Sequence, residues 1–152
     1  MKITHSKTAG AFLCVVAAVV VPANNSLKQY HLQHWHEILQ ETPGYSLMQH
    51  ANQLIPQHGN RLLQVGFENA VFFYNGIVIG DWFGPGRYRQ MMQCTDECRL
   101  IAPEAMREVM VRHNARTLLV NLKEGSKIDL PAYQLDFTLQ QLTPDGVLLT
   151  LK

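Results

Sequence analysis

The sequence is poor in charge, and the few charges it has nearly cancel. Charged residues make up 16% of the 152 residues, and 13 Lys and Arg against 12 Asp and Glu leave a formal net charge of +1. Nucleic-acid-binding domains carry a clear basic surplus, so this balance argues against nucleic acid as a partner. Hydrophobic residues reach 47%, which excludes intrinsic disorder because disordered chains are apolar-poor and charge-rich. The length corresponds to one domain.

The sequence also lacks a long hydrophobic run. Its most apolar stretch, 9–23, holds about 13 charge-free residues before Pro22, whereas a spanning helix needs about 20 and a signal-peptide core about 7–15. Lys2 and Lys7 precede this stretch, and Val21-Pro22-Ala23 at its end is an acceptable small-residue cleavage site. We therefore expect residues 1–23 to form a signal peptide or a membrane anchor helix, with the lysines inside and the remaining chain outside the cytoplasm. A buried segment of β-branched core residues is the alternative.

Cysteine is scarce, with three residues in the chain. Cys14 lies in the apolar stretch, while Cys94 and Cys98 form the motif CTDEC. An oxidising compartment would let this pair form a disulfide, and free thiols are the alternative. A zinc site requires further ligands, and the sequence offers no second cysteine pair. We expect neither a metal nor a cofactor.

Apolar periodicity divides the rest of the chain into a juxtamembrane segment and a domain. The apolar spacing in residues 24–44 predicts an amphipathic helix next to the membrane, in which Trp35 lies at the level of the lipid headgroups. The domain occupies residues 45–152. Its pattern predicts helices over 45–59 and 103–115, strands over 61–67, 76–83 and 116–122, and a β-hairpin over 133–152 that turns at Pro144, Asp145 and Gly146. Residues 68–76 fit a helical turn or an extended run, 85–94 a short helix or irregular connector, and 123–132 a loop.

Strands that alternate with helices favour a parallel sheet with helices packed on it. The closing hairpin adds an antiparallel edge. The sequence therefore predicts a small α/β domain with a mixed, partly parallel sheet, flanking helices and a C-terminal β-hairpin, preceded by an N-terminal membrane or signal helix.

The sequence lacks a nucleophile elbow, a P-loop, a zincin motif and a dinucleotide fingerprint, so it predicts no catalytic residue. The best local candidate for a ligand site is the segment Gly80 to Arg89, because Asp81 follows a strand end, where α/β proteins commonly bind ligands. Arginine side chains bind phosphate or carboxylate, and aromatic rings stack on sugars. Glu68 joins this site if it faces Asp81, and is otherwise a carboxylate at a helix start. The candidate binding residues are Glu68, Asp81, Trp82, Arg87, Tyr88 and Arg89. One alternative is a purely structural turn in which Asp81 accepts hydrogen bonds from the turn or pairs with Arg87, with Trp82 and Phe83 packed on the sheet edge. Another is a contact with a second molecule or domain.

Four short patterns, in this order, resemble a known family. Gly66 to Glu68, Phe72 to Tyr74, Gly80-Asp81 and Leu118 to Val120 are similar to landmarks in the C-terminal extracytoplasmic domain of GT-C glycosyltransferases. These membrane enzymes are protein mannosyltransferase-like or aminoarabinose transferase-like and use polyprenyl-phosphate sugars. The resemblance covers residues 40–152.

The resemblance implies a domain outside the cytoplasm that assists the transfer of a polyprenyl-phosphate-linked sugar to a protein, lipid or glycan. In that family the catalytic acids lie between early membrane helices, which this sequence lacks, so no catalytic residue is carried over. We therefore expect a noncatalytic domain with an accessory or acceptor-recognition role. Its partners would be the membrane, and a polytopic glycosyltransferase subunit or a glycan or lipid acceptor.

Two other functions remain open. An independent periplasmic or secreted protein that binds a small ligand would result from removal of the first 23 residues. A small soluble enzyme that uses Asp81 and the neighbouring arginines is the third hypothesis, although no nucleophile or cofactor motif supports it.

Overall fold

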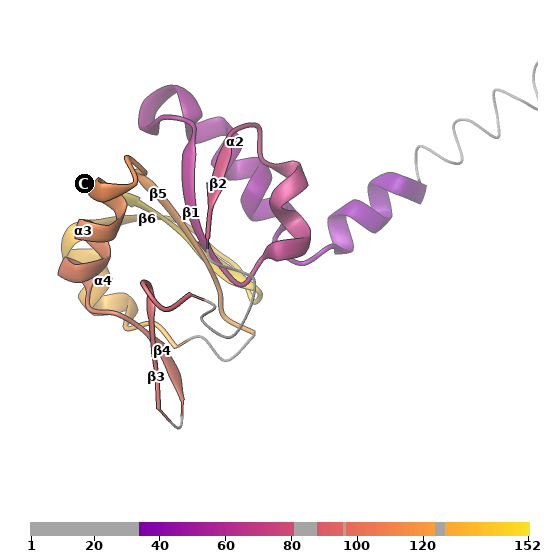
Figure 1. Ribbon diagram of the computed structural model, residues 1–152. Coiled ribbons are helices and arrows are strands. Elements are labelled where there is room, and N and C mark those ends of the chain that lie inside the picture. Colours follow the sequence, from indigo (N-terminus) through magenta and orange to yellow (C-terminus); the bar gives the residue numbers. More distant parts are fainter. Residues whose placement is uncertain (1–33, 81–87, 96, 124–126) are drawn as a thin grey trace, which may run out of the picture. The chain divides into compact units, whose positions relative to one another are not determined.

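The computed structural model describes residues 34–80, 88–95, 97–123 and 127–152 (Figure 1). The chain forms two compact units, Met1–Glu41 and Thr42–Lys152. In the first unit residues 34–41 are helical, as the pattern over 24–44 predicts, and His36 and Gln40 are hydrogen-bonded across one turn. The predicted signal or anchor segment, 1–23, lies outside the described residues. Within the described residues, no helix is both long enough and apolar enough to cross a membrane.

The second unit is built on a five-stranded mixed sheet with the strand order β2-β1-β5-β7-β6. The strands β2, β1 and β5 run parallel to one another, whereas β7 pairs antiparallel with both β5 and β6. The partly parallel sheet and the C-terminal hairpin predicted from the sequence are therefore confirmed. The strands are β1 (Arg61–Val65), β2 (Ile77–Ile79), β5 (Thr117–Asn121), β6 (Phe137–Leu142) and β7 (Gly146–Leu151).

Helices cover both faces of this sheet (Figure 1). One face carries α2 (Tyr45–His58) and the 3-10 helix η1 (Glu68–Phe73), which we call the α2–η1 layer. The other face carries α3 (Pro103–Arg112) and α4 (Leu130–Asp136), the α3–α4 layer. Successive strand residues point to opposite faces, so Leu62 is buried under the α2–η1 layer and Leu63 under the α3–α4 layer.

A small hairpin of β3 (Met92–Cys94) and β4 (Cys98–Leu100) stands apart from the main sheet. The sequence predicted a short helix or irregular connector over 85–94, and this prediction is wrong for β3. Strands of three residues are too short to show a period-two pattern, so periodicity could not reveal them. Leu100 and Ile101 nevertheless pack into the core beneath the α3–α4 layer.

The helix α4 corrects a second prediction, because its residues were assigned to a loop and to the start of a strand. The side chain of Asp129 accepts a hydrogen bond from the backbone N–H of Ala132 at 3.1 Å, and Pro131 lies in the first turn. An N-cap followed by proline is a standard helix start. Leu135, taken from the sequence as part of an alternating strand, is instead a 77% exposed residue of this helix.

Candidate functional site

The parallel strands β1 and β5 end side by side, and their carboxyl ends are joined by a polar cluster. Gly66 follows β1 with a φ of 85°, a left-handed conformation that favours glycine. Asn121, the last residue of β5, donates from Nδ2 to the carbonyl oxygen of Gly66 at 2.6 Å. A Cβ atom at Gly66 would lie 2.7 Å from the Cβ of Asn121. Glycine is therefore required for this close approach.

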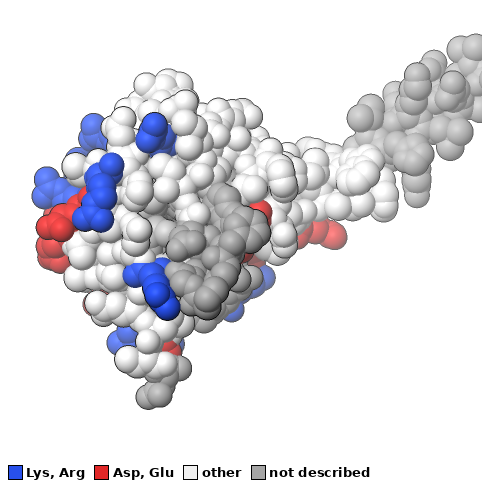
Figure 2. Space-filling model, in the orientation of Figure 1, with Lys and Arg blue, Asp and Glu red and all other residues white. Residues whose placement is uncertain are grey.

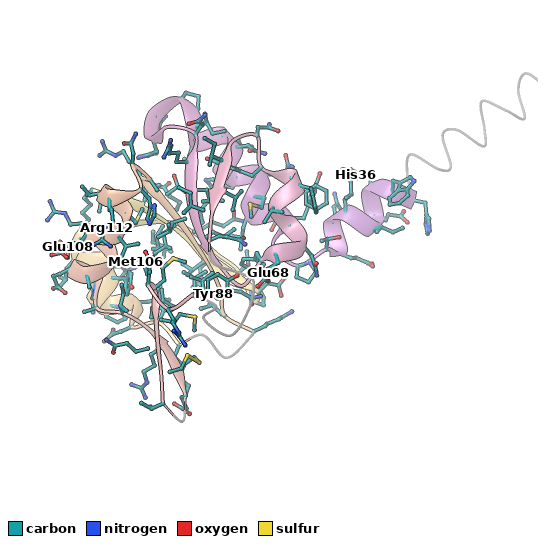
Figure 3. All side chains as sticks on the ribbon, in the orientation of Figure 1. His36, Glu68, Tyr88, Met106, Glu108 and Arg112 are labelled. Atoms are coloured by element: carbon teal, nitrogen blue, oxygen red, sulfur yellow. A yellow bond between two sulfur atoms is a disulfide. The ribbon has the colours of Figure 1, made fainter. Side chains whose placement is uncertain are left out.

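Tyr88 completes the cluster from a distant part of the chain. Its hydroxyl accepts a hydrogen bond from the backbone N–H of Gly66 at 2.9 Å and donates one to Oε1 of Glu68 at 2.8 Å. Figure 3 shows Glu68 and Tyr88 close to each other at this edge of the sheet. The tyrosine is 3% exposed and has a φ of 58°. The hydroxyl of Tyr88, a residue that comes after β2 in the chain, is therefore hydrogen-bonded to the backbone at the end of β1.

Of the six residues predicted as a binding site, the structure brings Glu68 and Tyr88 together and leaves Arg89 exposed beside them. Asp81, Trp82 and Arg87 lie outside the described residues, so the contact between Glu68 and Asp81 stays a prediction. The suggestion that Tyr88 stacks on a ligand does not fit its burial, because the ring packs within the core. Glu68 begins η1, in the helix-start position that the sequence allowed.

Replacing Tyr88 by phenylalanine tests this cluster. The variant keeps the ring but leaves the buried N–H of Gly66 without its acceptor, and Glu68 loses a donor. We expect Tyr88→Phe to lower the free energy of unfolding by about 1–3 kcal/mol, measured by urea denaturation. An unchanged unfolding free energy would show that the hydroxyl contacts contribute nothing to stability.

An apolar cavity of about 240 Å³ lies beside the edge strand β2, on the side of the α3–α4 layer. Leu63 and Ile79 are adjacent in the parallel register of β1 and β2 and form its floor, and Val109 of α3 faces them. Gln90 and His113 bring polar atoms to its wall. The complete set of described residues that line it is Leu63, Ile79, Gly80, Gln90, Met91, Val109 and His113.

The C-terminal end of α3, beside this cavity, is hydrogen-bonded to β1. The backbone carbonyl of His113, at the C-terminal end of α3, accepts a hydrogen bond from Nη1 of Arg61 at 3.0 Å. Pro103 occupies the first turn of the helix, where a missing N–H costs nothing. The sequence does not reveal this cavity, because its walls come from separate elements and no local motif marks them.

A second hollow, of about 490 Å³, lies over α3 near the end of α4. It is lined by Val111, by Asp136 and by charged residues of α3 that include Glu108 and Arg112, labelled in Figure 3. Charges of both signs are mixed along it, so it favours no single class of charged ligand. In the described part of the chain, no group of three or more His, Cys, Asp or Glu residues is placed to hold a metal ion.

The hairpin of β3 and β4 carries the remaining chemistry suggested by the sequence. A disulfide joins Cys94 and Cys98, which are opposite each other in the antiparallel register. Next to it Glu97 accepts a hydrogen bond from Nζ of Lys127 at 2.5 Å and lies 3.6 Å from Arg99. The hydrogen bond and positive charge of Lys127, and then the charge of Arg99, lower the pKa of the Glu97 carboxyl.

Tyr133 links the hairpin to α4. Its hydroxyl donates to the carbonyl oxygen of Ile101 at 2.7 Å. Burial, with a smaller contribution from the charge of Glu104, raises the pKa of Tyr133 well above its usual range. The hydroxyl therefore stays a neutral donor, and its role is structural. Burial also raises the pKa of Tyr74.

Together the fold and the cavity define a small mixed α/β domain with an apolar cavity beside the edge strand of its sheet. The chain belongs to the SF2091/S2213 family, whose model matches residues 34–150. It is similar to the uncharacterized protein SF2091.1/S2213 of Shigella flexneri, with 29% identity over 114 residues, which are 75% of this chain and 95% of that protein. No solved structure gives a significant match.

This family assignment corrects the resemblance to GT-C glycosyltransferases, because the matches contain no glycosyltransferase-related family. The physical reason lies in the four patterns themselves. Gly66 is a left-handed turn at a strand end, Phe72 lies on the outside of η1, and Leu118 to Val120 are the buried centre of β5. These landmarks are explained by local structure, and likeness at this level does not imply a common function.

Proposed function

We propose that this protein is a domain outside the cytoplasm that binds a small, largely apolar ligand in the cavity between β2 and α3. The cavity is the observation that carries the proposal. Its volume of about 240 Å³ exceeds the roughly 150 Å³ that accommodates benzene in an apolar protein cavity. An aromatic ring with one small polar substituent fits this space, and Gln90 or His113 would orient the substituent.

The cavity supports binding more than catalysis. The described residues that line it include no serine, threonine or cysteine that could act as a nucleophile beside His113. The Cys94–Cys98 disulfide supports a location outside the cytoplasm, because such bonds persist in oxidising compartments. The predicted apolar segment over 1–23 agrees with that location.

A cavity-filling substitution tests the proposal. Val109 lines the cavity, whereas Val111, two residues further along α3, is 63% exposed and lies outside it. We expect full-length protein to bind indole or benzamide with a Kd in the millimolar range, about −4 kcal/mol. Val109→Phe should abolish the saturation-transfer NMR signal because the larger side chain fills the cavity. Val111→Phe should retain the signal because the cavity is unchanged, and this variant controls for nonspecific association of the ligand.

A second variant fills the cavity from its other wall. Ile79→Phe extends from β2 into the same space and does not depend on how α3 tolerates a larger side chain. Melting curves establish that each variant is folded. Equal binding by the parent protein, Val109→Phe and Ile79→Phe would refute the cavity as the site.

A further inference from the structure

The α2–η1 layer is almost free of charge, in contrast to the opposite face of the molecule. Between residues 42 and 80 the sequence holds two residues that are formally charged at neutral pH, Arg61 and Glu68, and α2 has none. The helix α3 alone carries Glu104, Arg107, Glu108 and Arg112. Figure 2 shows charged side chains gathered over the α3–α4 layer, while the surface over α2 is largely uncharged. Across the whole chain 16% of the residues are charged, so the absence of formal charge from all 14 residues of α2 is a local feature of this face.

This face also carries the most exposed large apolar side chain of the described residues. Phe72, on the outer side of η1, is 88% exposed. Its neighbour Phe73 is partly buried and packs edge-on against Tyr45, with the ring centroids 5.0 Å apart. Tyr45 begins α2, so these aromatic residues lie where the chain enters the domain.

We propose that this nearly uncharged face, which carries the exposed side chain of Phe72, rests on the outer surface of the phospholipid bilayer. The inference relies on the membrane anchor expected over residues 1–23 and is independent of the cavity. An aromatic side chain on an uncharged surface suits the headgroup boundary, where a formal charge would be costly to desolvate. Within the domain, Thr42 accepts a hydrogen bond from the backbone N–H of Tyr45, at the start of this face.

The contribution of a single phenylalanine side chain to membrane binding is small, which explains why the domain also needs a membrane anchor. Burial of one phenylalanine side chain favours the bound state by roughly 10- to 100-fold, which is too little to recruit a free domain. Attachment to a membrane anchor raises the effective concentration of the bilayer surface at the domain, as linking two binding modules does. For an anchored chain, the same contact is therefore sufficient to hold the domain in one orientation.

A protein partner fits this face less well than lipid does. Interfaces between proteins use complementary charges to fix register and exclude wrong partners. The stretch 42–80 offers two charges for that purpose, and Glu68 is already engaged with Tyr88 at the sheet edge. A lipid surface, by contrast, does not need charged pairs to align it with the domain.

Brominated lipids test the proposed contact. The full-length chain is reconstituted in phosphatidylcholine–phosphatidylglycerol vesicles, with Trp35→Phe and Trp82→Phe removing the native tryptophans. Bromine on the acyl chains should quench the fluorescence of a Phe72→Trp variant strongly. The matched control is Leu135→Trp, which replaces a 77% exposed residue of α4 in the opposite layer and should be quenched severalfold less.

Hydrogen exchange gives a second readout that keeps every native tryptophan. Vesicles should slow exchange in the peptide that covers 68–76, and Phe72→Glu should restore fast exchange, whereas Leu135→Glu should not. Because Phe72 is exposed, its replacement leaves the core intact.

The possible results distinguish the proposed contact between the α2–η1 layer and the bilayer from the membrane anchor on which the proposal relies. Protein that fails to float with the vesicles would overturn both the membrane anchor and the inference. Protein that floats, but with equal quenching at the two positions, would overturn the inference alone. Crosslinking between copies through position 72 without quenching would assign this face to a second copy of the chain, which also overturns it.

Discussion

Gly146→Ala is expected to lower the free energy of unfolding by about 3 kcal/mol, near the upper end of what overpacking usually costs. Gly146 begins β7 and pairs with Asn121 of β5. An added Cβ atom would lie 2.5 Å from the carbonyl oxygen of Val120 and 2.6 Å from Cζ of Phe67. A backbone carbonyl in the centre of a sheet cannot move away without disrupting the pairing between β5 and β7.

Urea denaturation of Gly146→Ala and Gly59→Ala measures this effect against a control. Gly59 ends α2 with a φ of 80°, and an added Cβ atom there would meet nothing within 4 Å. Its φ of 80° combined with a ψ of 171° is a conformation almost confined to glycine, so its replacement should cost about 1–2 kcal/mol through backbone strain alone, less than the clash at Gly146. Equal losses in the two variants would show that the clash at Gly146 is relieved by a small shift, contrary to the prediction.

The same glycine links the sheet to the polar cluster. The ring of Phe67 packs between Gly146 and Gly44, where an added Cβ atom would lie 2.5 Å from Cδ1. Phe67 is 3% exposed and directly precedes Glu68. Displacement of this ring would therefore also move the carboxylate that accepts the hydrogen bond from Tyr88. Loss of stability and loss of the cluster are expected together.

Local signals predicted those elements whose side chains repeat over many residues. The helix α3 follows from Pro103 and the apolar spacing of Met106, Val109 and Met110, and all three apolar residues are buried. The hairpin of β6 and β7 follows from the turn at 143–146, where the Thr143 hydroxyl accepts from the backbone N–H of Gly146. By contrast, β3 and β4 have three residues each and are defined by pairing with each other.

The error at α4 has a different cause, because its helix-start signal was present. Asp129 and Pro131 mark an N-cap and a first turn, but the alternation of Leu135, Phe137 and Leu139 continues a strand pattern backwards into the helix. In the structure the alternation begins at Phe137, where β6 starts. Capping chemistry was the better guide here than apolar spacing.

The candidate site could be predicted only in part. Glu68 and Tyr88 were selected as polar and aromatic residues near strand ends, and the structure places them in contact. Their role in holding the sheet edge depends on Gly66 and Asn121, which lie 55 positions apart in the chain. The cavity likewise depends on how α3 lies relative to β2, which no local pattern contains.

The second large effect is expected from a substitution that increases stability. Gln64 is fully buried in β1, and neither Oε1 nor Nε2 has a hydrogen-bond partner in the structure. Because Leu63 and Val65 face the α3–α4 layer, Gln64 points with Leu62 toward the α2–η1 layer. A buried amide without partners costs about 1–3 kcal/mol. Gln64→Met, which has nearly the same shape, should raise the free energy of unfolding by about 2 kcal/mol.

The control for this prediction is the same substitution at a satisfied glutamine. Gln140 of β6 donates from Nε2 to Oγ1 of Thr150 at 2.8 Å, so Gln140→Met should lower the unfolding free energy by about 1 kcal/mol. Opposite signs for the two variants, from parallel urea titrations, would establish that the amide of Gln64 is a cost to the fold. A loss of stability in Gln64→Met would instead mean that ordered water satisfies the amide, since buried water typically bridges such groups. The sign of the change in unfolding free energy for Gln64→Met thus decides whether water is bound next to this amide in the α2–η1 layer.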